Sequence, residues 1–377
     1  MKKLFSLLLV LAFFLTSTYS FSENFPKNDP IPEGVMYRGI NKEQWKVIKK
    51  IGDPLDCQKR LFEFQKIKNY KVINPQDCIE NRNCINDALI NHKYVKLKEG
   101  KYTIDSTINV IDSVLIGESN KTLIDAQYVK TAIQVDNGVV ANIIVNYAKD
   151  IAFDIKFNSL LFRSIAKNTG TRNPKTKNGH GFSIVDYKLD KSRTDKEKKE
   201  GKGFSFNSCL ISLESYNGYN ETGNSKNTKK GGNADGFQIK YGSADITLID
   251  THAHHNSDDG YDFWKAGRKS NDPVIRIFYS SANYNGKHPT KSNGDGNGYK
   301  FGSSDTAQKN RGKDWGPRLI YGSVACGNKM NGFDRNNSSA EIFSYNNQAK
   351  KNRKKNFFKV SKKKINEDIH VLKCSMF

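Results

Sequence analysis

Cysteine is scarce in this sequence, with six residues among 377. No Cys-x-x-Cys pair occurs, and no Cys/His spacing matches a zinc site. Six cysteines in a chain of this length also do not make a disulfide scaffold. The closest two, Cys78 and Cys84, lie within the segment DCIENRNC. We expect these two to form a bridge in an oxidising compartment.

Long hydrophobic runs are absent after the first residues. Residues 1–22 combine two early lysines, an apolar run from Leu4 to Leu15 and small residues at 20 and 22. This pattern is typical of a secretory signal peptide. The run is too short to span a bilayer comfortably, and no later segment is long enough. The sequence therefore predicts a secreted protein, extracellular or periplasmic, without a membrane span.

Acidic residues are outnumbered by basic ones, 39 to 61, and the formal net charge is +22. A basic secreted protein suits a polyanionic polysaccharide, an anionic membrane surface or a nucleic acid. The charge alone does not choose among these partners, because a lysine-rich composition can also reflect codon bias. The motifs described below favour an acidic polysaccharide over nucleic acid, and we expect a monomer.

Helical periodicity is nearly absent after Tyr94. Short runs rich in Val, Ile, Thr and aromatic residues are separated by turn residues, which is typical of a sandwich, a barrel or a parallel β-helix. The preceding region has helical spacing around Ile85, Ala88 and Leu89. We interpret residues 23–93 as a partly helical cap that covers the end of a solenoid.

Internal repetition favours the β-helix among these alternatives. From residue 160 onwards a unit recurs, made of a β run, a turn with Asn, a loop and a Gly-aromatic pair. The glycines of these pairs are Gly181, Gly236, Gly260, Gly298 and Gly332. Unequal intervals indicate loop insertions at a fixed place in each repeat. We predict an all-β, right-handed parallel β-helix over 94–360, followed by a C-terminal tail or cap at 361–377.

Two segments are dominated by charge. We expect residues 188–202 to form a solvated, mobile loop, because they carry both signs of charge and almost no apolar residue. Residues 350–364 are strongly basic. We interpret them as a solvated face, with a polyanion-binding tail as the alternative.

Carboxylates gather around the Gly-aromatic pairs. If each motif is one turn of a solenoid, Asp235 stacks beside Asp259, and Asp262 beside Lys300. Asp258 directly precedes Asp259. Four carboxylates cannot all be ionised within a few ångströms without a cation, and hard oxygen ligands on flexible loops favour Ca²⁺. Ordinary turn chemistry is the structural alternative for these aspartates.

Lys300 is the candidate general base. A bound dication disfavours the ammonium form of a nearby lysine, and a neutral lysine can remove a proton. The four aspartates oppose that shift, so we expect only a partial lowering of its pKa; a plain salt bridge is the alternative. Ca²⁺ and a neutral lysine together suit β-elimination on a uronate polymer. Candidate contacts for substrate carboxylates in the surrounding loops are Lys287, Lys291, Arg311 and Arg318.

Two other constellations are weaker. Residues 179–181 (GHG) and the Asp258–Asp259 pair also occur in polygalacturonases, but there an NTD motif comes first and the order of the two fragments is reversed. A glycoside hydrolase is therefore disfavoured. His252 and His254 would share one strand face, but a zinc site lacks further nearby ligands. We expect packing or a hydrogen-bonded turn there.

Residues 207–359 resemble family nine of the polysaccharide lyases, through NADGF, HNSDDGYD, GNGYKFG and ACGNKMNGFDRN. The resemblance implies a Ca²⁺-dependent pectate lyase with a right-handed parallel β-helix. It implies Lys300 as base and, as metal ligands, Asp235, Asp258, Asp259 and Asp262. We thus expect cleavage of polygalacturonate by calcium-assisted β-elimination. The alternatives are a lyase for another acidic uronate polymer and a non-catalytic β-helix carbohydrate-binding protein or adhesin.

Overall fold

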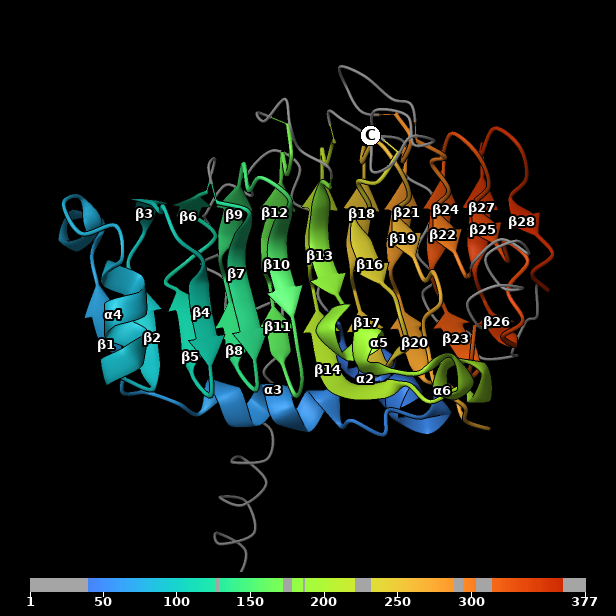
Figure 1. Cartoon of the computed structure of the whole chain (residues 1–377), viewed down its shortest axis with the longest axis horizontal. Coiled ribbons are helices and arrows are strands. Elements are labelled where there is room, and N and C mark those ends of the chain that lie inside the picture. Colours follow the sequence, from blue (N-terminus) through green and yellow to red (C-terminus); the bar gives the residue numbers. More distant parts are fainter. Residues whose placement is uncertain are drawn as a thin grey trace, which may run out of the picture.

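The computed structural model describes residues 40–126, 129–171, 178–185, 187–220, 232–287, 294–302 and 314–361. The predicted signal peptide, the tail from residue 362, Lys291 and Arg311 lie outside these residues. The described chain winds into one elongated solenoid whose coils each contribute a strand to three parallel sheets (Figure 1). The predicted all-β parallel β-helix is confirmed.

The first sheet has ten strands and the other two have nine each. The first contains β1 (Lys71–Ile73), β2 (Tyr94–Leu97), β5 (Val114–Gly117), β8 (Val139–Ala141), β11 (Leu160–Phe162), β14 (Phe204–Ile211), β17 (Ser243–Ile249), β20 (Ile275–Phe278), β23 (Arg318–Tyr321) and β26 (Ile342–Tyr345). The second contains β3 (Gly100–Thr103), β6 (Thr122–Asp125), β9 (Ile144–Asn146), β12 (Ile165–Lys167), β15 (Glu214–Tyr216), β18 (His252–His254), β21 (Ser281–Asn283), β24 (Val324–Cys326) and β27 (Gln348–Lys350). The third contains β4 (Ile108–Ile111), β7 (Thr131–Asp136), β10 (Ile151–Ile155), β13 (His180–Ile184), β16 (Phe237–Ile239), β19 (Tyr261–Asp262), β22 (Tyr299–Lys300), β25 (Phe333–Asp334) and β28 (Phe357–Phe358).

The Gly-aromatic pairs lie on adjacent coils, as predicted. Phe237 pairs in register with Tyr261, which pairs with Tyr299. These buried rings stack at centroid distances of 4.8 and 4.5 Å and extend a column through the core. A Cβ at Gly236 would lie 2.6 Å from the Cβ of Ala253 and 2.8 Å from the carbonyl oxygen of Gly260. The pair therefore repeats because each coil places an aromatic residue in the core, and the position before it has no room for a side chain.

Stacked asparagines stabilise the turn after the second sheet. Asn256 Nδ2 donates to Asn285 Oδ1 at 3.1 Å, and Asn285 Nδ2 donates to Asn328 Oδ1 at 3.2 Å. Asn328 continues the ladder to Asn352 at 2.9 Å. Each amide satisfies buried polar atoms of its neighbour, so the turn keeps the same shape from coil to coil.

The predicted cap is divided between two places. The 3₁₀ helix η1 (Pro75–Cys78) and α4 (Cys84–Asn91) lie at the end of the solenoid, where Ile85 and Leu89 join the internal core. The disulfide predicted between Cys78 and Cys84 is present. The expectation that all of residues 23–93 close the end needs correction. Helices α2 (Lys42–Ile51) and α3 (Cys57–Gln65) instead run along the outside of the first sheet (Figure 1).

An external apolar cluster explains the position of α2 and α3. Trp45 and Ile48 of α2 pack with Phe162, Ile249 and other outward-facing residues of the first sheet. A disulfide joins Cys57 of α3 to Cys209 of β14. The outer face of this sheet is apolar, and the two amphipathic helices remove it from water.

Of the two expectations for the charged segments, the mobile loop is corrected and the solvated face is confirmed for its described part. Most of residues 188–202 are helical, in α5 (Tyr187–Ser192) and α6 (Asp195–Glu200), because Thr194 and Glu197 form a capping box at the start of α6. The described part of the basic segment from residue 350 belongs to the last coil, with β27 and β28, and its lysines and arginine are exposed, as expected of a solvated face. No helix within the described ranges is both long and apolar enough to cross a membrane.

Candidate metal and catalytic site

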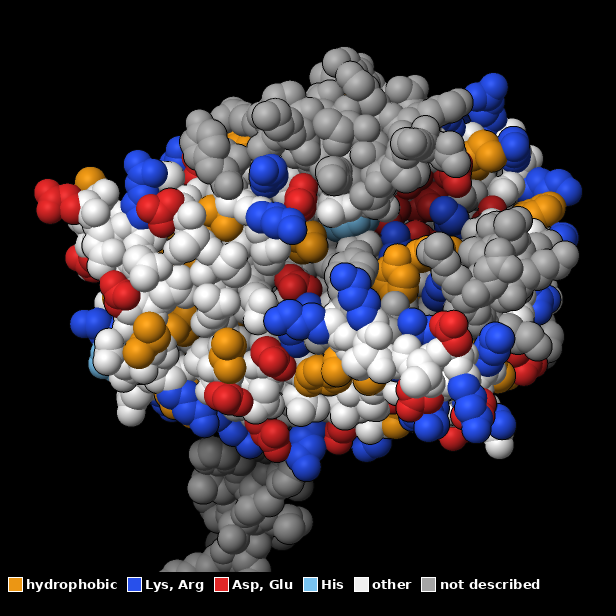
Figure 2. All heavy atoms as spheres, viewed as in Figure 1, with side chains coloured by type: hydrophobic (Ala, Val, Ile, Leu, Met, Phe, Trp, Pro, Cys, Tyr) orange, Lys and Arg blue, Asp and Glu red, His pale blue; other side chains and the backbone are white. Residues whose placement is uncertain are grey.

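The site lies on the outer face of the third sheet, where β16, β19 and β22 are consecutive neighbours. Side chains alternate along a strand, so the residue after each buried aromatic points outward. The register places Asp262 directly opposite Lys300. Acidic side chains gather on this face over β19 and β22, right of centre in Figure 2, with basic ones close by. The coil repeat therefore brings opposite charges together from distant parts of the sequence.

Asp259 is the centre of the cluster. Its Oδ2 lies 2.9 Å from Lys300 Nζ, while its Oδ1 accepts from the backbone and side-chain nitrogens of Asn297 at 2.7 and 3.0 Å. Carboxylate oxygens of Asp235, Asp259 and Asp262 lie within 4.8 Å of one another. Oxygens of Asp258, Asp259 and Asp295 form a second group of that size. All four predicted aspartates and Lys300 thus meet at one place.

Lys240 is a member of the cluster that the sequence analysis missed. Its Nζ lies 2.7 Å from Asp262 Oδ2 and 3.0 Å from Asp235 Oδ2, and its side chain is almost fully buried. Strand alternation could have found it, because Lys240 lies two residues after Gln238 on the outward face.

His180 was also missed as a site residue. It belongs to the GHG fragment that was considered only in comparison with hydrolases. The backbone nitrogen of Asp235 donates to His180 Nδ1 at 3.2 Å, and this histidine is fully buried. Burial, followed by the charge of Lys240, holds the pKa of His180 well below its usual value. The ring is therefore neutral and orients Asp235.

The pKa values of the aspartates diverge within this small volume. Burial, reinforced by Asp259, raises the pKa of Asp258 well above its usual range. Burial also raises the pKa of Asp259 to about 7, although Lys300 opposes the shift. For Asp262, burial acts upward, but Lys240 and Lys300 outweigh it and the pKa is lowered. The metal-free cluster therefore still holds protons near neutral pH.

The Lys300 ammonium is strongly favoured in this metal-free arrangement. Burial acts to lower its pKa, but the charges of Asp259, Asp262 and Asp258 outweigh burial and raise the pKa well above its usual value. We expected a partial lowering for the cation-bound chain. Without a cation, the negative charges of the carboxylates outweigh burial, and the pKa of Lys300 is raised instead of lowered.

The residues fit a hard dication. The five carboxylates of these two groups and the two lysines Lys240 and Lys300 would carry five negative and two positive charges if all were ionised, leaving a formal charge of −3. Asp262 Oδ1 is buried and has no hydrogen-bond partner in the described part of the chain. An unsatisfied buried carboxylate oxygen is costly unless a ligand takes it up. Asp235, Asp258, Asp259 and Asp262 would hold Ca²⁺, because oxygen-only donors suit that ion.

The predicted substrate contacts have different surroundings. Lys287 is exposed, and its Nζ lies 5.6 Å from the ring centroid of Tyr284. Arg318 is fully buried in β23, where its Nη2 donates to the carbonyl oxygen of Ala266 at 3.1 Å and lies 3.8 Å from Asp314. Because it is buried, Arg318 stabilises a turn and cannot contact a polymer. We therefore do not propose a substrate-binding role for Arg318. Lys291 and Arg311 lie outside the described residues.

The histidine group on the second sheet is internally bonded. His252 lies between Ser281 Oγ and Asp250 Oδ1, at 2.8 and 2.9 Å, and His254 Nε2 lies 2.8 Å from Glu214. Both side chains are almost buried. This matches the expected packing and hydrogen-bonding role.

Comparison with known proteins gives a family model and a curated relative. A family model described as Pel9A-like, right-handed beta helix region, matches residues 90–366. Pectate lyase L of Dickeya dadantii (strain 3937) is 31% identical over 152 residues, which are 40% of this chain and 32% of that protein. The chain thus spans about a third of the length of this curated relative.

One solved structure shows the same fold. The crystal structure of pectate lyase Pel9A matches with a TM-score of 0.54 and 20% identity over 77% of this chain and 71% of its own. A rhamnogalacturonan lyase gives a TM-score of 0.46 at 16% identity, over 68% of this chain and 65% of its own. The family model covers well over half of the chain, and the predicted resemblance to family nine of the polysaccharide lyases is confirmed. This chain belongs to the Pel9A-like right-handed β-helix family.

Proposed function

We propose that this chain is a secreted polysaccharide lyase that cleaves polygalacturonate by β-elimination. Lys300 is the proposed base, and Asp235, Asp258, Asp259 and Asp262 are the proposed Ca²⁺ ligands. The observation that carries the proposal is the pairing of Lys300 with Asp262 in register, with Lys300 Nζ 2.9 Å from Asp259 Oδ2. This closeness of a lysine to a carboxylate cluster supports its proposed role as a base beside a cation site.

The chemistry assigned to Lys300 is one proton transfer. Its neutral Nζ takes the proton from C5 of the uronate, and the C5–H electron pair stays on C5 and its carboxyl group. This pair forms the C4=C5 double bond as the C4–O bond breaks, and the departing oxygen takes a proton from water to become the hydroxyl of the new chain end. When bound, Ca²⁺ would neutralise the carboxylates that favour the Lys300 ammonium and would offset the uronate charge, making the C5 proton more acidic.

The named relatives support the same reaction class. Pectate lyase L and pectate lyase Pel9A carry that activity in their names. The similarity to the first covers 40% of this chain and 32% of that protein, so the substrate is a proposal. A lyase for another uronate polymer, or a non-catalytic carbohydrate-binding β-helix, are the competing functions.

A substrate screen separates these functions. Purified chain with Ca²⁺ is incubated with polygalacturonate, highly methyl-esterified pectin, alginate and a glycosaminoglycan, and the absorbance of the unsaturated uronate is followed. We expect the signal to rise fastest with polygalacturonate, because each of its sugars offers a free carboxylate. A faster rise with alginate or the glycosaminoglycan would reassign the substrate. No rise with any polymer, from protein that binds Ca²⁺, would favour the non-catalytic function.

Lys287 is proposed to hold a substrate carboxylate, as are Lys291 and Arg311. We expect Lys287→Ala to raise KM for polygalacturonate by about threefold with little change in kcat, since an exposed ion pair contributes about 0.2–1 kcal/mol. The difference between variant and parent should shrink at high ionic strength, where exposed charges are screened. Steady-state kinetics at low and high salt measure both effects. The exposed Lys269, changed to Ala, is the matched control, and an unchanged KM for Lys287→Ala would remove it from the site.

A further inference from the structure

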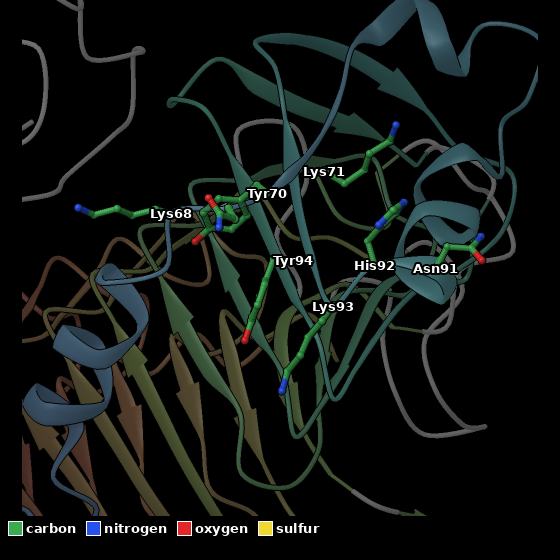
Figure 3. Close-up of a pocket in the computed structure, with 8 residues that line it drawn as sticks. Lys68, Tyr70, Lys71, Asn91, His92, Lys93 and Tyr94 are labelled. Atoms are coloured by element: carbon green, nitrogen blue, oxygen red, sulfur yellow. The ribbon is translucent and has the colours of Figure 1, made fainter.

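A concave surface lies at the opposite end of the solenoid from the last coils. It has a volume of about 620 Å³ and is lined by residues 68–71 and 91–94 (Figure 3). These segments lead into β1 and β2, and β1 is the end strand of the first sheet. We call this surface the basic-aromatic hollow.

Positive charge dominates the hollow. Lys68, Lys71 and Lys93 line it and are exposed. Among the described residues no carboxylate forms an ion pair with any of the three, whereas other surface lysines such as Lys98 and Lys101 have acidic partners. The three side chains extend in different directions from the hollow (Figure 3), so they present separate positive charges that suit an extended polyanion.

Two tyrosines give the hollow an apolar wall. The rings of Tyr70 and Tyr94 pack edge-to-face with centroids 6.2 Å apart, and both are only partly buried. Lys93 Nζ lies 5.8 Å from the centroid of Tyr94, and the two side chains run in the same direction (Figure 3). The amides of Asn69 and Asn91 add neutral hydrogen-bonding groups.

This combination of groups selects a ligand class. Ammonium groups bind carboxylates, tyrosine rings cover the C–H faces of a sugar, and amides bond to hydroxyls. A lipid surface would instead require apolar side chains in the hollow. The exposed aliphatic residues of this region, Val72, Ile79 and Ile90, do not line it. We propose that the basic-aromatic hollow binds the uronate units of an acidic polysaccharide.

The hollow is separate from the candidate catalytic site. From β2 to β17, which precedes β19 in the same coil, the first sheet passes through five strand pairings. At about 4.8 Å for each pairing, this is about 24 Å along the axis. A long polymer held at the hollow is retained near the protein, which raises its effective concentration at the catalytic site. The choice of a uronate ligand rests on the proposed function, but the binding itself does not require catalysis.

Binding of an oligogalacturonate to the Lys300→Ala protein, in excess chelator, tests the proposal by calorimetry. Chelation removes cation-mediated binding, and the substitution prevents cleavage. We expect the binding that remains to be weakened at least about fivefold by the pair Lys71→Ala and Lys93→Ala, and to be changed less by Lys287→Ala at the catalytic site. The matched control is the pair Lys42→Ala and Lys49→Ala on α2, which removes the same charge from exposed positions and should leave affinity unchanged.

Further arms identify the ligand. Tyr94→Leu should weaken the oligogalacturonate but leave the binding of inorganic polyphosphate of similar charge unchanged. Equal affinity in the Lys71/Lys93 pair and its control overturns the proposal, as does stronger binding to anionic phosphatidylserine vesicles than to the sugar. If the hollow variants bind normally while Lys300→Ala abolishes cleavage, only the hollow is refuted. If the hollow binds uronate but the wild-type chain cleaves no polymer, only the lyase assignment fails.

Discussion

Lys300→Arg is expected to lower kcat on polygalacturonate by about 10³-fold, within the range that a general base contributes. Arginine keeps the positive charge beside Asp259 and Asp262 but cannot lose its proton in the accessible pH range. Lys300→Ala should be equally inactive. Initial rates from the unsaturated-uronate absorbance, measured with saturating Ca²⁺, give the comparison.

Two controls separate the loss of a base from a loss of structure or metal. Ca²⁺ should bind Lys300→Ala at least as tightly as the parent, because the substitution removes a positive charge from the carboxylate cluster. The exposed Lys269→Arg variant should keep full activity. Substantial cleavage by Lys300→Arg would show that Lys300 acts only through its charge and that another group removes the proton.

Removal of Ca²⁺ is expected to abolish cleavage and to destabilise the chain in a pH-dependent manner. The pKa of Asp259 in the folded, metal-free chain is about 7, above its usual 3.8. The folded state therefore binds more protons than the unfolded state between these values. Stability in chelator should fall as pH rises from about 4 to about 7. Thermal unfolding at pH 5.5 and pH 8 in excess chelator measures this fall.

Ca²⁺ should reverse that trend. At a concentration 100 times its Kd, a bound ion adds about 2.7 kcal/mol to the free energy of unfolding. Its effect should be larger at pH 8 than at pH 5.5, because protons compete for the same carboxylates. An equal effect of Ca²⁺ on Tm at both pH values, or full activity in chelator, would contradict the site.

Asp259→Asn supplies the matched variant. The amide oxygen can still accept from Asn297, so the turn should keep its shape. The Ca²⁺ affinity should drop by at least about 10-fold. Removal of a residue that only orients a metal ligand already costs about this much, and Asp259 is itself a proposed ligand. The fall in metal-free stability between pH 5.5 and pH 8 should also become smaller, because this variant carries no ionisable group at position 259.

Much of the fold was predictable because a solenoid repeats its local rules. A Gly-aromatic pair in each coil predicted that Phe237, Tyr261 and Tyr299 would stack, and their register confirms it. The same alignment predicted that Asp262 would face Lys300. Because equal positions of successive repeats stack, residues far apart in the sequence can be predicted to be neighbours in space.

The positions of α2 and α3 could not be predicted in this way. Both helices are amphipathic. This pattern predicts that one face of each helix is buried, but it does not identify the surface against which that face packs. The outer face of the first sheet became their partner only when apolar residues such as Phe162 and Ile249 came together on successive coils.

By itself the sequence determined the parallel β-helix, the family and the five charged residues that converge. Only the tertiary structure decided the electrostatic balance among them. Lys240 and His180 enter the cluster from a strand continuation and a neighbouring coil, and they change the charge around Asp235 and Asp262. Burial then moves the pKa of Asp259 upward while the carboxylates move that of Lys300 upward. Such shifts depend on distances of a few ångströms and on the exclusion of water, which no spacing in a sequence specifies.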